Sequence, residues 1–231
     1  NNAASVKAIV AVGEKPVLDN VDAAMPDSPT LKHRIALSAG RPGWLCLAEG
    51  IKAASGSLAR LPTENADPSL LYFTSGTTGE PKATMHFHRD LLSIADGYAR
   101  EVLGVVPDDV FVGSPPLAFT FGLGGLAIFP LRFGATATLL ENASPANMIE
   151  IIETYKATIS FTSPTAYRAM MAAMDRGADL STLRMAVSAG ETLPSPIFQD
   201  WTRKTGRPIL DGIGTTELLQ IFISNRLGDA P

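Results

Sequence analysis

The sequence has little charge and almost no cysteine. Of its 231 residues 18% are charged, and 23 acids outnumber 19 lysine and arginine residues, giving a net charge of −4. Without a basic excess, the chain cannot hold a nucleic-acid backbone or an anionic membrane surface by charge. The single cysteine, Cys46, excludes an internal disulfide and a cysteine-based zinc site. We therefore expect a cytoplasmic protein that does not bind nucleic acid, with Cys46 buried as a small hydrophobic side chain.

Long uninterrupted apolar runs are also missing. Residues 110–131 are uncharged and long enough to cross a bilayer, which takes about 20 residues. Prolines and glycines divide this stretch into short pieces, so we expect no membrane span. The chain begins at Asn1 with neither a methionine nor the basic and apolar segments of a secretory signal. This start predicts a processed or truncated chain.

What the sequence does contain is a large apolar fraction in alternating patterns. Hydrophobic residues make up 45% of the chain, enough for a sizeable core. From residue 70 onward, short apolar runs alternate with helical patterns, which predicts an α/β fold of layered, mostly parallel sheets covered by helices. The predicted strands are 70–74, 110–113, 135–140, 158–162, 184–188 and 208–211, and the predicted helices are 89–103, 124–131, 145–155, 164–176 and 194–205.

The first 69 residues form a less regular part. They predict strands at 6–12 and near 34–38, a helix at 44–54 and a surface connector at 62–68. We therefore divide the chain into residues 1–69 and residues 70–231.

A loop rich in hydroxyls and glycine follows the predicted strand at 70–74. It reads Thr74-Ser75-Gly76-Thr77-Thr78-Gly79-Glu80-Pro81-Lys82. Glycines let backbone N–H groups surround an anion, hydroxyls add donors, and lysine adds a positive charge. Because proline precedes the lysine, the loop does not match the phosphate-binding motif of P-loop NTPases. The loop predicts phosphate binding in a different nucleotide fold, and a plain surface turn is the alternative.

At this loop the sequence resembles the adenylate-forming superfamily, which includes acyl-CoA synthetases, firefly-type luciferases and peptide-synthetase adenylation domains. The family's Ser-Gly-Thr-Thr-Gly-x-Pro-Lys-Gly hallmark is matched except that Ala83 replaces the last glycine. Segments 116–124, 188–194 and 211–217 match further family motifs in order. The resemblance covers residues 70–231 and implies part of the large N-terminal domain. Residues 70–231 would be its nucleotide- and acyl-binding subdomain and residues 1–69 a partial N-terminal subdomain segment, with the small C-terminal domain absent.

The resemblance also implies roles for individual residues. Thr216 would contact the α-phosphate, Glu217 would hold Mg²⁺, and Ile213 stands where many members place a tyrosine against adenine. The implied nucleotide-binding residues are Thr74, Ser75, Gly76, Thr77, Thr78, Gly79, Lys82, Gly190, Glu191, Thr192, Asp211, Gly212, Ile213 and Thr215. The implied acyl-pocket residues are Phe119, Thr120, Phe121, Gly214 and Gln220. For the two phenylalanines, core packing is the alternative.

Residues 211–225 look most like the branch of benzoate and aminobenzoate CoA ligases. The implied reaction adenylates an aromatic carboxylate with ATP and Mg²⁺ and transfers it to CoA, releasing AMP and pyrophosphate. Two alternatives stay open: a nucleotide-binding fragment without turnover, and an adenylation domain that loads a carrier protein. The family's ribose-binding motif, hinge and adenylation lysine are missing, so the isolated chain is expected to show little or no catalysis.

His86 and His88 are two residues apart in an extended segment, which places both imidazoles on one face. This spacing is compatible with a metal site, although the sequence indicates no third ligand. The alternative is a role at a turn or at the start of the next helix, near Asp90.

Overall fold

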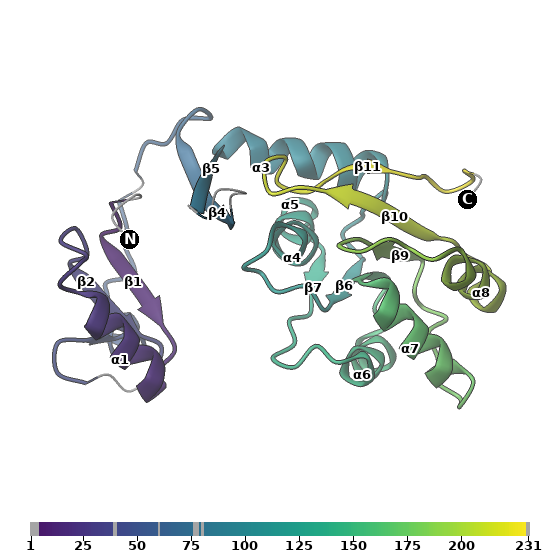
Figure 1. Ribbon diagram of the computed structural model, residues 1–231, viewed down its shortest axis with the longest axis horizontal. Helices are drawn as coiled ribbons and strands as arrows, with labels where there is room; N and C mark the ends of the chain where they lie inside the picture. Colours follow the sequence, from purple (N-terminus) through teal and green to yellow (C-terminus); the bar gives the residue numbers. More distant parts are fainter. Residues whose placement is uncertain (1–4, 39–40, 60, 76–78, 80, 230–231) are drawn as a thin grey trace. The chain divides into compact units, whose positions relative to one another are not determined.

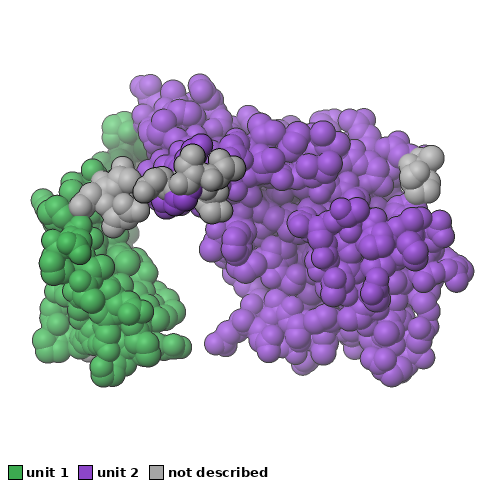
Figure 2. All heavy atoms as spheres, in the orientation of Figure 1, with its two compact units in different colours: residues 1–63 green, residues 64–231 purple. Residues whose placement is uncertain are grey.

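The computed structural model describes residues 5–38, 41–59, 61–75, 79 and 81–229 (Figure 1). The chain divides into two compact units, residues 1–63 and residues 64–231 (Figure 2). Within the described residues, no helix combines the length and the apolar character that a membrane crossing requires.

The first unit is a small parallel sheet with a helix on one face. Its strands are β1 (Ala8–Ala11), β2 (His33–Ala36) and β3 (Leu45–Cys46), and its helices are α1 (Lys15–Ala24) and α2 (Leu47–Ala53). Leu18 of α1 packs with Ala11, Ala36 and Trp44 in a separate core cluster. Helix α1 was not predicted, and Cys46 is half-buried where full burial was expected.

The second unit contains a six-stranded sheet, ordered β11-β10-β9-β8-β6-β7. Neighbouring strands are parallel except for the antiparallel pair β10 and β11. All residues of β8 and β9 are buried, as expected for strands covered on both faces. The predicted mostly parallel α/β fold is therefore confirmed. The strands are β6 (Val110–Gly113), β7 (Thr136–Ala137), β8 (Ile159–Thr162), β9 (Met185–Ser188), β10 (Ile209–Gly214) and β11 (Ile221–Ser224).

Two helical layers cover this sheet, as Figure 1 shows. On one face lie α6 (Pro145–Tyr155), α7 (Pro164–Met174) and α8 (Ser195–Thr205), whose core includes Tyr167 and Trp201 in edge contact at 4.8 Å between ring centres. On the other face lie α3 (His88–Ile94), the π-helical turns η2 (Ala95–Arg100) and η3 (Gly124–Ile128), α4 (Thr120–Leu123) and α5 (Phe129–Phe133). Alternate strand residues face the two layers, so Phe111 packs in one core and Val112 in the other.

The predicted starts of the helices at 145–155 and 164–176 are confirmed, and both lie at Ser-Pro steps. The hydroxyl of Ser144 accepts the N–H of Asn147 at 3.2 Å, and that of Ser163 accepts the N–H of Ala166 at 3.4 Å. Pro145 and Pro164 then occupy the first helical position, where a missing N–H costs nothing. Local chemistry therefore determines where α6 and α7 begin.

Several predicted boundaries are wrong because pairing with distant segments decides them. The strand predicted at 135–140 is only the two-residue edge strand β7. The predicted connector at 62–68 reaches into β4 (Pro68–Ser75), which pairs antiparallel with the unpredicted strand β5 (Pro81–Phe87) in a separate two-stranded sheet. The helix predicted at 89–103 starts one residue earlier and changes to π geometry at η2.

Candidate functional site

Polar side chains gather where the parallel strands end. Ser114 follows β6, Thr162 and Ser188 end β8 and β9, and Asp211 lies in β10. The sheet register pairs Thr162 with Ser188 and Ser188 with Asp211, and the Ser114 and Thr162 hydroxyls are 2.6 Å apart. Ligands of open α/β sheets bind at this carboxyl edge. The row of polar groups therefore marks this edge as the candidate site.

Asp211 lies at the end of this row with an incompletely satisfied carboxyl group. Burial raises the pKa of Asp211, while the Ser188 hydroxyl and the N–H groups of Leu193 and Gly212 oppose that rise. Among the described residues, neither the Ser188 hydroxyl nor Oδ1 of Asp211 has a partner with normal hydrogen-bond geometry. Leaving a buried acceptor unpaired costs roughly 1–3 kcal/mol. Oδ1 of Asp211 is therefore a buried acceptor whose hydrogen-bonding capacity is unused.

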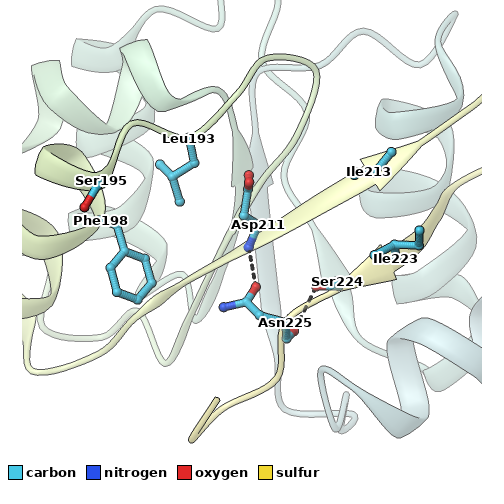
Figure 3. Close-up of a pocket in the computed structure, with 8 residues that line it drawn as sticks. All are labelled: Leu193, Ser195, Phe198, Asp211, Ile213, Ile223, Ser224 and Asn225. Carbon is cyan, nitrogen blue, oxygen red and sulfur yellow. Dashed lines mark hydrogen bonds between the residues drawn. The ribbon is translucent and has the colours of Figure 1, made fainter. Parts of the chain in front are cut away.

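A cavity of about 340 Å³ opens beside Asp211 (Figure 3). Leu193 and Phe198 lie on one side of Asp211 in this view, and Ile213 and Ile223 lie on the other. The Asp211 N–H donates to Oδ1 of Asn225 at 2.7 Å, which ties β10 to the segment after β11. The apolar side chains on both sides of Asp211 suit a flat ring. The remaining lining residues are Ser195, Ser224 and Asn225.

The two faces of β10 have different surroundings. Asp211 and Ile213 share the face of the cavity, and Ile213 is 59% exposed. Gly212 points to the opposite face, where a Cβ atom would lie 2.5 Å from Cδ1 of Ile221. A side chain at position 212 therefore requires Ile221 to move. Strand β10 thus has the cavity on one face and the packed side chain of Ile221 on the other.

The segment after β10 forms a tight turn that presents Glu217. The Leu218 N–H donates to the Thr215 hydroxyl at 3.1 Å, and the Leu219 N–H donates to the Thr216 carbonyl at 3.2 Å. Leu219 has a φ of +65°, a left-handed conformation that costs a non-glycine residue roughly 1–3 kcal/mol. Glu217 is exposed, and its carboxylate makes no ion pair with a described residue.

The hydroxyl-rich loop lies between the paired strands β4 and β5. Register pairs Thr74 with Lys82 and Ser75 with Pro81, and Gly79 has a φ of +84°, which favours glycine. Lys82 is exposed. Of the other predicted phosphate-binding residues, Gly76, Thr77 and Thr78 lie outside the described residues. The described residues on either side of this loop belong to the two paired strands of a hairpin.

Glu191, predicted to contact nucleotide, binds to a helix start in this structure. Its Oε1 accepts the backbone N–H of Thr165 at 3.1 Å and the Thr165 hydroxyl at 2.9 Å. These two hydrogen bonds hold the pKa of Glu191 below its usual value. The neighbouring Gly190 has a φ of +90°, and Thr192 follows in the same exposed loop. A nucleotide contact by these three residues stays a prediction.

The aromatic segment divides into an exposed part and a packed part. Phe119 precedes α4 and is 65% exposed, so it is not packed in the core. Phe121, inside α4, contacts the ring of Phe161 with 5.5 Å between centres. The core-packing alternative therefore applies to Phe121 and not to Phe119.

Gln220 connects this segment to the turn after β10. It is buried, and its Nε2 donates to the carbonyls of Thr120 and Phe121 at 3.3 Å each, while its Oε1 accepts the N–H of Ile221 at 3.0 Å. Both polar ends of Gln220 are thus used inside the protein. Gly214 lies against the Gln220 backbone, where a Cβ atom at position 214 would be 3.1 Å from the Gln220 carbonyl oxygen.

Gly124 is a residue whose role the sequence motif did not reveal. A Cβ atom at this position would lie 1.9 Å from Nε2 of Gln220. The sequence motif at 116–124 ends in this glycine, but its contact is with Gln220, almost a hundred positions later, so the motif alone could not reveal it.

We expect Gly124→Ala to displace the Gln220 amide from the carbonyls that it binds. Lost hydrogen bonds and overpacking should lower the free energy of unfolding by roughly 1–3 kcal/mol. Gly97→Ala is the matched control, because a Cβ there meets no atom within 4 Å. Urea unfolding of both variants measures the difference, and equal stabilities would contradict the assigned contact.

Comparisons with known proteins show the family to which the chain belongs. The family model described as AMP-binding enzyme matches residues 2–231. The benzoate–CoA ligase of Thauera aromatica is 41% identical over 204 residues, which cover 87% of this chain and 38% of that protein. The crystal structure of an anthranilate CoA ligase in complex with anthranoyl-AMP superposes with a TM-score of 0.86 at 34% identity, covering 98% of this chain and 43% of that one. A benzoate CoA ligase from Burkholderia xenovorans LB400 gives 0.82 at 32% identity, covering 98% and 44%.

The chain thus spans well under half the length of each of these three relatives. The match to the family model nevertheless extends over nearly all of its residues, and the helices and parallel sheet agree with those of the solved relatives. The chain belongs to the AMP-binding enzyme family, the adenylate-forming acyl-CoA ligases, and within that family it is similar to benzoate and aminobenzoate CoA ligases.

Proposed function

We propose that the full-length protein carrying this sequence activates an aromatic carboxylate with ATP and transfers the acyl group to CoA. The observation that carries the nucleotide half of this proposal is the cavity beside Asp211. Its apolar walls can sandwich adenine, and the unpaired Oδ1 of Asp211 can accept the exocyclic amine of the base. The aromatic half rests on the relatives, one named benzoate–CoA ligase and one crystallised with anthranoyl-AMP.

The reaction would proceed in two displacements. A carboxylate oxygen attacks the α-phosphorus of ATP, and pyrophosphate leaves with the electrons of the broken P–O bond. The thiol sulfur of CoA then attacks the acyl carbon, AMP leaves with the carboxylate oxygen, and the thiol proton passes to solvent. Positioning and charge stabilisation supply most of the catalysis in such transfers.

The proposed nucleotide roles are those that the resemblance of these motifs to the family implies. Lys82 and the hydroxyl-rich loop between β4 and β5 would surround the phosphates, with Thr216 at the α-phosphate. Glu217 suits Mg²⁺, since it is an exposed carboxylate without an ion-pair partner among the described residues. The metal would supply positive charge against the phosphates. The full proposed nucleotide set is Thr74, Ser75, Gly76, Thr77, Thr78, Gly79, Lys82, Gly190, Glu191, Thr192, Asp211, Gly212, Ile213, Thr215, Thr216 and Glu217.

The acyl group would bind on the opposite face of β10, near α4. The exposed ring of Phe119 is free to contact it, and Thr120, Phe121, Gly214 and Gln220 would form the neighbouring wall. Because both polar ends of Gln220 bind backbone groups, we propose that Gln220 shapes this wall and does not hydrogen-bond the substrate.

A panel of acids tests this function. With ATP, Mg²⁺ and CoA, the full-length protein should use benzoate or 2-aminobenzoate with a kcat/KM at least about tenfold above that for acetate or octanoate. A clearly larger kcat/KM for an aliphatic acid would contradict the aromatic assignment. Adenylate formed without any transfer to CoA would instead favour an enzyme that loads a carrier protein.

The chain of 231 residues, tested alone, is a separate case. We propose that it binds ATP weakly, does not turn over, and derives from a cytoplasmic protein. Calorimetric titration with ATP and Mg²⁺ measures the affinity, and micromolar binding accompanied by pyrophosphate release would contradict this proposal.

A further inference from the structure

His86 joins two segments that lie far apart in the sequence. It is 4% exposed on β5, and its Nε2 lies 2.7 Å from the carbonyl oxygen of Thr216. A carbonyl oxygen only accepts hydrogen bonds, so Nε2 must bear the proton. Nδ1 is 3.7 Å from Oδ2 of Asp90, which is beyond hydrogen-bond distance. Because Nε2 bears a proton, it cannot coordinate a metal ion. In this arrangement His86 could therefore not serve as a metal ligand through Nε2.

The Thr216 carbonyl accepts a second hydrogen bond, from the N–H of Leu219 at 3.2 Å. Both acceptor positions of this oxygen are therefore in use. The same peptide group contains the N–H of Glu217, so the two hydrogen bonds fix the backbone at the start of Glu217. Leu219 is held at positive φ in this turn, a conformation that persists only where surrounding contacts enforce it. His86 provides one such contact from outside the turn.

The hairpin of β4 and β5 needs such contacts to keep its place. It forms a two-stranded sheet of its own, and its described residues make no strand pairing with the six-stranded sheet. Besides the His86 contact, the Tyr72 hydroxyl donates to the carbonyl of Leu117 at 3.4 Å, a long hydrogen bond. Asp90 also accepts the N–H of Phe87, where α3 follows β5. Of the two hydrogen bonds that side chains of described hairpin residues make to distant segments, that of His86 is much the shorter.

We propose that His86 is a positioning residue that sets the spacing between the phosphate-binding hairpin and the Thr216–Glu217 turn. The inference rests on the proposed function, because it assigns Lys82 and Glu217 to the same nucleotide. His86 itself touches neither substrate nor metal. Misplacing one side of a transition-state clamp by about 1 Å can cost a hundredfold in rate. His86 therefore acts on the chemical step more than on substrate binding.

Two amide variants of the full-length protein test the inference. In His86→Gln, the terminal amide nitrogen can reach the position of Nε2 and donate to the Thr216 carbonyl. In His86→Asn, the amide nitrogen lies near the position of Nδ1 and is too far from the Thr216 carbonyl to donate to it. Both variants place the same amide group at a buried position and differ by one methylene. The control is His33→Gln, which changes an exposed histidine of β2 in the other unit.

The rate of adenylation is measured as the rate of pyrophosphate release at varied concentrations of ATP and acid. We expect His86→Asn to lower kcat by about tenfold to a hundredfold, with KM for the acid changed less than threefold. His86→Gln should restore kcat to within about threefold of the wild type, and His33→Gln should match the wild type. A merely structural role would lower the melting temperature of both amide variants without separating their kcat values.

The outcomes distinguish this inference from the function on which it rests. A wild type without adenylation contradicts the proposed function. An active wild type with equal kcat in His86→Asn and His86→Gln contradicts only the role of His86. If neither variant folds, nitrogen NMR of the wild-type imidazole decides: a hydrogen-bonded Nε2–H supports the inference, and the Nδ1–H tautomer overturns it.

Discussion

Replacing Glu217 with glutamine is expected to slow acyl-adenylate formation in the full-length protein by about two to three orders of magnitude. Glutamine keeps the size and one acceptor oxygen of the side chain but removes its negative charge, which Mg²⁺ binding requires. Glu217 is exposed and has no ion-pair partner among the described residues, so the fold should be unaffected.

Pyrophosphate release at saturating ATP and benzoate measures this effect. Glu150→Gln is the matched control, since Glu150 is an exposed acid of α6 outside the site. The control should retain the wild-type rate, and both variants should keep the wild-type melting temperature. A Glu217→Gln rate equal to that of the control would eliminate the metal-binding role.

Replacing Asp109 with alanine is expected to lower the free energy of unfolding by about 3–5 kcal/mol. Asp109 is 2% exposed, and its carboxylate accepts Nε of Arg184 at 2.7 Å, the Thr158 hydroxyl at 2.7 Å and the N–H of Val106 at 2.9 Å. The variant leaves these donors without their partner at the end of the sheet opposite the candidate site. Such a loss is a large part of the stability of a typical domain.

Urea unfolding at neutral pH measures the loss, and the exposed neighbour Asp108 provides the control Asp108→Ala, expected within about 0.5 kcal/mol of the wild type. Equal values for the two variants would contradict the account of Asp109.

The lowered pKa of Asp109 predicts that the free energy of unfolding depends on pH. Its burial acts to raise the pKa, but Arg184, the N–H of Val106 and the Thr158 hydroxyl together hold the pKa below the usual 3.8. The unfolded state therefore binds the proton more tightly, and the stabilisation by Asp109 is present above the unfolded pKa and lost as pH falls through the folded pKa. The stability difference between the wild type and Asp109→Ala should consequently shrink below about pH 4.

The parts of the fold that local chemistry determines could be predicted from the sequence. Strand β6 has the predicted bounds, and α6 and α7 begin at the predicted residues, because the serine cap and the proline at each start act within one helical turn. Strand β11 could not be predicted in this way. Phe222 and Ile223 are both exposed, so its residues lack the alternation of a half-buried strand, and its pairing with β10 fixes it.

The candidate site shows the same limit. The motif at 211–217 identified Asp211 and Ile213, and the structure places both beside one cavity. Phe198 and Ile223 also line this cavity, but their approach depends on where α8 packs and on the pairing of β10 with β11. The contact between His86 and Thr216 likewise spans 130 positions, so no local pattern could indicate it.

The most direct test of the central claim is to follow the carboxylate oxygen. The full-length protein is incubated with ATP, Mg²⁺, CoA and benzoate labelled with oxygen-18 in its carboxylate, and the nucleotide product is examined by mass spectrometry. Attack of the carboxylate on the α-phosphorus predicts that the label appears in AMP, since the transferred oxygen stays with phosphorus when the thiol displaces it. Formation of ADP, or of AMP without label while benzoyl-CoA accumulates, would contradict the assignment of this protein as an adenylate-forming aryl-CoA ligase.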